Sequence, residues 1–337
     1  MAAGVITDGD RRPVSWRRAH PAAALACQRV LAGIVTLFVV SLVVFLATQV
    51  LPGNAAYAVL GHTATPARVH ALERQLHLNR GLFDQYWLWL SGLLTGSPGT
   101  SLANGLSVWG QVFPRLINSA GLVFISGAIG SVLGVALGAA AAMWRGSWFD
   151  RVSSVTLLGI TSLPEFVVGI VLIVLLATNV SHLFPAVSLL PPGTYFWDAP
   201  SALVLPVATL VIVIIPYIFR MTRAAMIEAL ESDYVEMARL EGLSPVRVVV
   251  MHALPNAIPT TIQVIGLTYL YLAGGIVVVE FLFNYPGIGQ GLVNAVENRD
   301  IPTVQLIVVV LAAFYIFMNI LSDIIALLAT PRRRISG

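Results

Sequence analysis

Long apolar stretches alternate with polar ones along this chain, and this alternation predicts a helical membrane protein. An α-helix of about 20 residues crosses the ~30 Å hydrocarbon core of a bilayer. Six apolar runs have this length, so we expect an all-α integral membrane protein with six transmembrane helices. The runs are Val30–Val50, Asn118–Met143, Thr156–Thr178, Leu203–Phe219, Ile258–Val279 and Val304–Ala329.

Arginine is distributed unevenly between the polar segments, and its distribution predicts the orientation of the chain. With the N-terminus inside, the cytoplasmic segments hold fourteen arginines and the outer segments hold five. Short cytoplasmic loops are enriched in basic residues. We therefore expect both termini to be cytoplasmic, together with the loop 222–256.

This topology divides the chain into five parts. Residues 1–29 are a cytoplasmic tail, 30–51 the first transmembrane helix, 52–117 an extracytoplasmic segment, 118–330 the transmembrane core, and 331–337 a second cytoplasmic tail. Within 52–117, the amphipathic stretch Ala67–Leu78 and the aromatic cluster Tyr86–Trp89 are typical of helices that lie at the membrane surface.

The composition supports a membrane location and excludes several kinds of chemistry. The 337 residues are 57% hydrophobic and only 10% charged, whereas soluble domains are about 25% charged. All nineteen basic residues are arginine, and without lysine the chain has neither a phosphate-binding P-loop nor a Schiff-base lysine. Cys27 is the only cysteine, and the six histidines lack metal-ligand spacing. We expect no catalytic residue, no cofactor and no metal site in this chain.

A polar stretch between two apolar runs carries the signals of a short helix. Asp233 and Glu236 resemble a capping box, and Gly242 is placed to end the helix in a left-handed conformation. Side chains at positions i, i+3, i+4 and i+7 share one face of a helix. So short a helix is marginal in water and needs a partner groove. That face comprises Tyr234, Met237, Ala238 and Glu241.

Two carboxylates and one helix break lie within or beside apolar runs. An ionised side chain at the centre of a membrane helix costs roughly 2.5–3.5 kcal/mol, so Glu165 and Glu280 should face a partner or a cavity. For Glu165, contact with a substrate competes with a hydrogen bond to a neighbouring helix; for Glu280, transport competes with a role at the helix end. Tyr285-Pro286-Gly287-Ile288-Gly289 cannot continue a helix and should lead into a re-entrant or surface segment.

Three glycines are spaced four residues apart in the second apolar run. Gly130, Gly134 and Gly138 predict close packing of this helix against a neighbour, with either a static or a moving interface.

Several stretches resemble the permeases of ATP-binding-cassette (ABC) importers. Glu236-x-Ala238, then Gly242 and finally Leu254-Pro255 resemble the Glu-Ala-Ala loop of that superfamily, although Met237 stands where alanine is usual and His252 where isoleucine is usual. Further stretches resemble its dipeptide, oligopeptide and nickel branch. They are Leu51-Pro52-Gly53-Asn54, Gln85-Tyr86-x-x-Trp89-Leu90, Gly96-x-x-Gly99-x-Ser101, Glu280-x-x-Phe283-x-Tyr285-Pro286-Gly287-Ile288-Gly289, Arg299-Asp300-Ile301-Pro302-x-Val304-Gln305, Asp323 and Pro331-Arg332.

The resemblance implies a MetI-like permease fold in the inner membrane and a role without chemistry of its own. The loop would dock on a separate ATPase through a coupling helix, and ATP and Mg would bind only to the ATPase partners. Those partners would be two ATPases, a second permease and an extracytoplasmic binding protein that delivers peptides; membrane lipid would surround the chain, with no nucleic acid involved. The coupling residues would be Asp233, Tyr234, Glu236, Met237, Ala238, Glu241, Gly242, Leu254 and Pro255, and candidates for the translocation path are Glu165, Glu280, Tyr285, Pro286 and Gly287.

Two alternatives stay open. The same kind of permease carries nickel or another small solute in related systems, so peptide is one of several substrates that the resemblance allows. Glu165 also keeps open a secondary transporter working alone, because ion-coupled carriers use carboxylates in the middle of the membrane.

Overall fold

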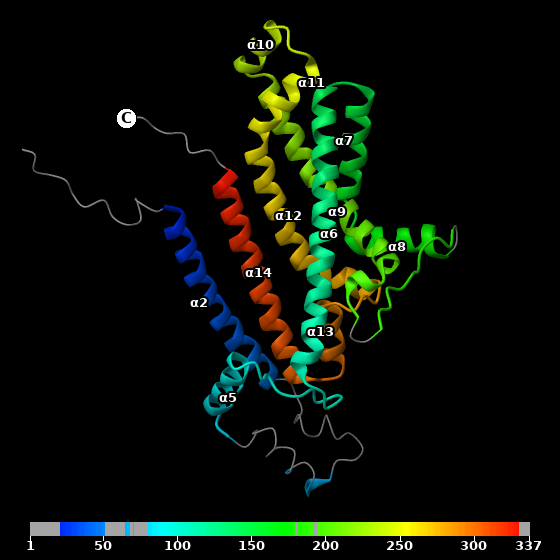
Figure 1. The fold of residues 1–337 in the computed structure, drawn as a ribbon. Coiled ribbons are helices and arrows are strands. Elements are labelled where there is room, and N and C mark those ends of the chain that lie inside the picture. The colour runs from blue at the N-terminus through cyan, green and yellow to red at the C-terminus, as the bar shows by residue number, and fades with distance from the viewer. Residues whose placement is uncertain are drawn as a thin grey trace, which may run out of the picture.

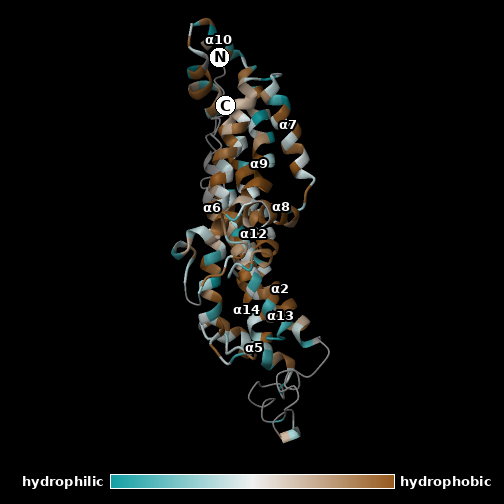
Figure 2. Ribbon diagram, turned by 90° about the vertical axis from the view of Figure 1, so that its right-hand side faces the viewer, coloured by the Kyte–Doolittle hydropathy of each residue, from teal (hydrophilic) through white to brown (hydrophobic). Residues whose placement is uncertain are grey.

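The computed structural model describes residues 21–50, 65–67, 70, 80–178, 181–191 and 194–329, and these are mostly helical. Five helices are long and apolar enough to cross a membrane, and they run lengthwise through the molecule (Figure 1). Figure 2 shows that hydrophobic residues predominate along them. They are α2 (Pro21–Val50), α6 (Val108–Met143), α9 (Pro200–Leu230), α12 (Leu254–Leu282) and α14 (Ile301–Ala329).

The expected third span, Thr156–Thr178, is not a single helix. It is divided between α7 (Trp148–Thr161) and α8 (Glu165–Ile173), which continues into a π-helical turn at Val174–Thr178. The two halves meet at 104°, and a sixth crossing exists only if this bent pair is counted as one span. Pro164 explains the break, because proline lacks an N–H and disfavours helical backbone at the residue before it.

All five long helices extend beyond the apolar runs that predicted them; α2 begins at Pro21 rather than Val30, and α14 begins at Ile301 rather than Val304. The second span begins at Val108 rather than Asn118, and the fourth continues to Leu230. The short helix α11 (Pro245–Val248) and a π-helical turn (Val249–Ala253) lead directly into α12, so one apolar helix runs over Val246–Leu282. The expected loop 222–256 is therefore mostly helical, with non-helical residues only at 231–232 and 241–244.

Close contact between α6 and α9 confirms the packing predicted from the glycine spacing. A Cβ atom built on Gly134 would lie 2.8 Å from the Ile218 Cβ, and one on Gly138 would lie 2.7 Å from the Phe219 carbonyl oxygen. A larger side chain at either position would push the helices apart. The glycines therefore let α6 lie against α9, the most buried of the five long helices.

The two ends of the bundle differ in what they carry. The start of α2 and the end of α14 lie at the same end as α10 (Asp233–Leu240), and α13 (Ile288–Glu297) and α5 (Leu82–Leu94) lie toward the opposite end (Figure 1). This agrees with the expected relation between the termini and the polar loop; which end faces the cytoplasm stays a prediction. Arg29 pairs with Asp323 (Nε to Oδ2, 2.8 Å) and joins α2 to α14.

The segment 52–117, which we expect to be extracytoplasmic, is described only in part. α5 is the expected aromatic helix. Tyr86 is buried, and its hydroxyl forms a hydrogen bond with the Ser41 hydroxyl of α2 (2.8 Å between the oxygens), while Phe83 and Trp87 are exposed. Most of Ala67–Leu78, all of Leu51–Asn54, residues 1–20 of the first tail and the tail 331–337 lie outside the described residues.

Candidate functional site

The polar stretch singled out in the sequence forms the short helix α10, which lies at one end of the bundle beyond α9 and α11 (Figure 1). Gly242 follows it with φ of +80°, as predicted for a left-handed helix end. The predicted capping box is wrong. Ser232 occupies the N-cap position, and its hydroxyl donates back to the Ala229 carbonyl of α9 (2.5 Å), so Asp233 is the first helical residue.

Burial determines which face of α10 is free. Val235 and Ala238 are 0% and 4% exposed and pack against residues at the end of α9 and in the π-helical turn before α12. The prediction that Ala238 belongs to the docking face is therefore wrong. We define the α10 outer face as Tyr234, Met237 and Leu240, which are 42%, 59% and 77% exposed.

The remaining residues predicted for coupling fall into two groups, one exposed on α10 and one at the start of α12. Asp233, Glu236 and Glu241 are exposed on α10 or at its end, where they are accessible to a partner. Leu254 and Pro255 do not end a loop but begin α12, and Leu254 packs against the same cluster as Val235.

Ion pairs that sequence reasoning missed support this end of the molecule. Asp150 of α7 accepts two hydrogen bonds from Arg223 of α9 (2.6 and 2.8 Å) and one from the Gly146 backbone N–H (2.9 Å). Arg145 pairs with Glu231 just before α10. The sequence did indicate where α7 begins, because Ser147 lies three residues before Asp150. The Ser147 hydroxyl caps α7 by accepting a hydrogen bond from the Asp150 backbone N–H.

At the other end, the predicted break after α12 is present, and Glu280 holds it in place. The carboxylate is fully buried and accepts hydrogen bonds from the Ser119 hydroxyl (2.5 Å) and from the backbone N–H groups of Gly289 and Gln290 (2.7 and 3.2 Å). It thereby caps the N-terminus of α13 and joins α12, α13 and α6. We call these contacts the Glu280 latch.

The three residues of the break contact α6 as well. The Tyr285 hydroxyl donates to the Asn118 carbonyl (2.9 Å), the Asn118 amide donates to the Pro286 carbonyl (3.2 Å), and Arg115 donates to the Gly287 carbonyl (3.2 Å). These contacts support the fold of the turn. A role of Glu280, Tyr285, Pro286 or Gly287 in the translocation path stays a prediction.

Glu165 lies in a different environment. It is the first residue of α8, it is half-buried, and its Oε2 accepts a hydrogen bond from the Tyr271 hydroxyl of α12 (2.7 Å). The Tyr271 ring lies 6.1 Å from the ring of Tyr217 on α9. The predicted hydrogen bond to a neighbouring helix is therefore present. Sequence reasoning identified Glu165 but neither tyrosine, because only the fold brings the three helices together.

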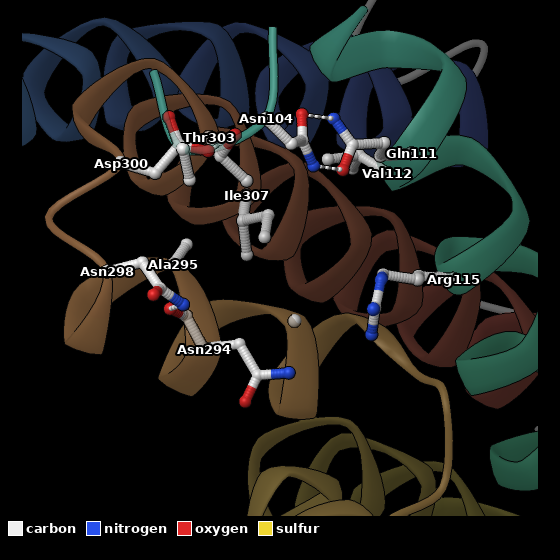
Figure 3. Close-up of a pocket in the computed structure, with 12 residues that line it drawn as sticks. Asn104, Gln111, Val112, Arg115, Asn294, Ala295, Asn298, Asp300, Thr303 and Ile307 are labelled. Atoms are coloured by element: carbon white, nitrogen blue, oxygen red, sulfur yellow. Dashed lines mark hydrogen bonds between the residues drawn. The ribbon is translucent and has the colours of Figure 1, made fainter. Parts of the chain in front are cut away.

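A polar pocket of about 200 Å³ opens between the loop before α6, α13 and the start of α14 (Figure 3). Asp300 lies at its edge and accepts hydrogen bonds from Ser101 (2.5 Å), the Leu102 N–H (3.0 Å) and Thr303 (2.7 Å). Two stretches quoted for the resemblance, around Ser101 and Asp300, thus meet in space. The other polar side chains that line the pocket are Asn104, Gln111, Arg115, Asn294 and Asn298.

In the part of the chain that the structure describes, no group of three or more His, Cys, Asp or Glu residues is placed to hold a metal ion. Long apolar helices, a broken span and a short helix that lies beyond their ends define a multi-pass membrane protein.

Comparison with known proteins gives the family. Residues 130–335 match the model of the binding-protein-dependent transport system inner membrane component, and residues 24–115 match the N-terminal model of the same kind of component. The chain belongs to this family of ABC-importer permeases and is a multi-pass inner membrane protein with the MetI-like fold.

Curated relatives agree with this assignment along most of the chain. The glutathione transport system permease protein GsiC of Escherichia coli K12 is 33% identical over 307 residues, which cover 91% of this chain and 97% of the relative. The probable peptide ABC transporter permease protein y4tP of Sinorhizobium fredii is 33% identical over 309 residues, covering 91% and 98%. Family membership implies the partners of such importers: a second permease, ATPase subunits and a binding protein.

Proposed function

We propose that this chain is the permease subunit of an importer of short peptides. It forms half of the translocation path with a second permease, receives peptides from an extracytoplasmic binding protein, and couples to two ATPase subunits that bind ATP and Mg. The chain itself carries out no chemical step. The names of its relatives, which include a glutathione permease and a probable peptide permease, support peptides as the substrate class.

The α10 outer face is the observation that carries the coupling proposal. Tyr234, Met237 and Leu240 leave apolar surface exposed on a helix that lies beyond the end of the bundle. An amphipathic helix docks by laying such a face in a groove of its partner. Val235 and Ala238 fix the opposite face to α9 and α12, so a force on α10 reaches the membrane helices through packed side chains.

Reconstitution tests both parts of the proposal. The chain, its sister permease, its two ATPases and its binding protein are placed in proteoliposomes, and uptake of labelled tripeptide, glutathione and Ni²⁺ is measured with and without ATP. We expect uptake of a peptide that depends on ATP and stops with an ATPase variant unable to hydrolyse it.

Two results would overturn the proposal. Uptake of Ni²⁺ without uptake of any peptide would assign the substrate to another class. Uptake that is independent of ATP and of the ATPases would instead identify a secondary transporter.

A further inference from the structure

Two tyrosines lie where the helices of this chain leave a surface uncovered. On α9, Tyr217 is the only exposed residue between positions 202 and 219, a stretch that is otherwise buried or half-buried. On α12 from Gln263 onward, the exposed residues follow a single helical stripe, and Tyr271 lies in the middle of it. That stripe is Gln263, Leu267, Tyr271, Gly274, Val278 and Phe281.

Glu165 adds a negative charge to this surface. As the first residue of α8 its carboxylate lies at a helix N-terminus, where the aligned backbone dipoles favour an anion. The Tyr271 hydroxyl donates to Oε2, but Oε1 accepts no hydrogen bond within the described residues. Neither is Glu165 part of an ion pair there, although Asp150 on α7 and Asp323 on α14 each have an arginine partner.

The chemistry of the three side chains fits an organic cation. A carboxylate oxygen without a donor accepts a charge-assisted hydrogen bond from an ammonium group. The two aromatic rings, 6.1 Å apart, add an attraction for a cation over their faces. A carboxylate within a transmembrane segment is costly and is typically placed on a substrate or ion pathway.

We propose that Glu165, Tyr217 and Tyr271 form the subsite that receives the positively charged α-amino group of a peptide in transit. The inference rests on the proposed function and names the chemical group that the path recognises. Every free peptide carries this group whatever its side chains, so one such subsite serves substrates of varied sequence.

The test uses the ionisation of the peptide and the complete importer. Uptake of trialanine is compared between wild type and Glu165→Gln at pH 6.5 to 9. An α-amino group titrates near pH 8, so the ammonium that contacts Glu165 is present below that pH and is lost above it. We expect wild type to be about tenfold faster at pH 6.5, as for the loss of one charged hydrogen bond. The ratio of the two rates should fall toward one at pH 9.

Variants and substrates of matched shape serve as controls. Tyr271→Phe keeps the ring but loses the donor and should reduce uptake two- to threefold. Asp84→Asn makes the same change from carboxylate to amide on the exposed side of α5 and should leave uptake unchanged. With N-acetyl-trialanine, which has no ammonium, wild type and Glu165→Gln should be equally fast at every pH. Size-exclusion profiles of each assembled variant confirm that the complex is intact.

The outcomes separate the inference from the function on which it rests. A ratio near one at pH 6.5, or a ratio that is the same at all pH values, would overturn the subsite, the second result indicating that Glu165 only packs α8 against α12. Failure of the wild-type importer to take up any peptide at any pH would overturn the proposed function instead.

Discussion

The Glu280 latch makes a quantitative prediction about stability. Glu280→Gln keeps the shape of the side chain but removes its charge, which weakens the bonds from Ser119, Gly289 and Gln290. A hydrogen bond to a charged group contributes about 1.5–3 kcal/mol and a neutral one about 0.5–1.5 kcal/mol, so each bond loses roughly 1 kcal/mol. The three bonds together would lower the free energy of unfolding by about 3 kcal/mol, and because a neutral amide is less costly to bury than a carboxylate, we expect a net decrease of about 1–3 kcal/mol. Glu280→Ala, which leaves all three buried donors without an acceptor, should lower it further.

Thermal denaturation in detergent measures this loss, with the fraction of monodisperse protein followed as temperature rises. Glu228→Gln, an exposed carboxylate on α9, is the matched control and should melt like wild type. The reasoning is refuted if Glu280→Gln melts at the wild-type temperature. If Glu280→Gln melts at the wild-type temperature but has lost uptake in the reconstituted importer, Glu280 is a residue of the translocation path and not a support for α13.

Three further predictions concern α10 and the orientation of the chain. Met237→Asp should leave thermal stability unchanged but weaken ATPase co-purification at least tenfold, because burying a methionine in the ATPase groove contributes about 1.5–3 kcal/mol. Ala238→Asp should lower thermal stability as well, since its charge enters the chain's own core. Equal behaviour of the two variants would contradict the assigned faces. The backbone of Gly242 is left-handed, and the space beside it is open, so Gly242→Ala should act through backbone strain alone and destabilise the segment by about 1–2 kcal/mol. Faster proteolysis around residues 241–244 would show this loss. A reporter active only in the cytoplasm should work after residue 337 and fail near residue 80, and activity at both sites would exclude the proposed topology.

Features determined by local chemistry were predictable from the sequence. Apolar length located the spans, Gly242 ended α10 as its spacing indicated, and the Tyr285–Gly289 stretch broke α12. Each of these depends on a few adjacent residues or on a run of one composition. The breaking effect of Pro164 is local too, but the long apolar run around it concealed the bend between α7 and α8.

Features determined by tertiary packing were not predictable. Ala238 fits a mostly apolar helix face in the sequence, yet it faces the chain's own core, because Val235 and Ala238 together cover the end of α9. Tyr217 and Tyr271 are 54 positions apart and resemble ordinary aromatic residues of membrane helices. The partners of Glu280 come from α6 and α13, and no spacing in the sequence relates Ser119 to Gly289.

The unbroken helix over Val246–Leu282 has a mechanical consequence. At 1.5 Å per residue, its 37 residues extend about 55 Å, nearly twice the thickness of the hydrocarbon core. One end lies beside α10, and the other carries Glu280. Rotation of such a rod by about 5° around one end moves the other by roughly 5 Å, comparable to one turn of a helix. In the proposed coupling, a small displacement of α10 would therefore turn this helix and move its Glu280 end by a distance on that scale.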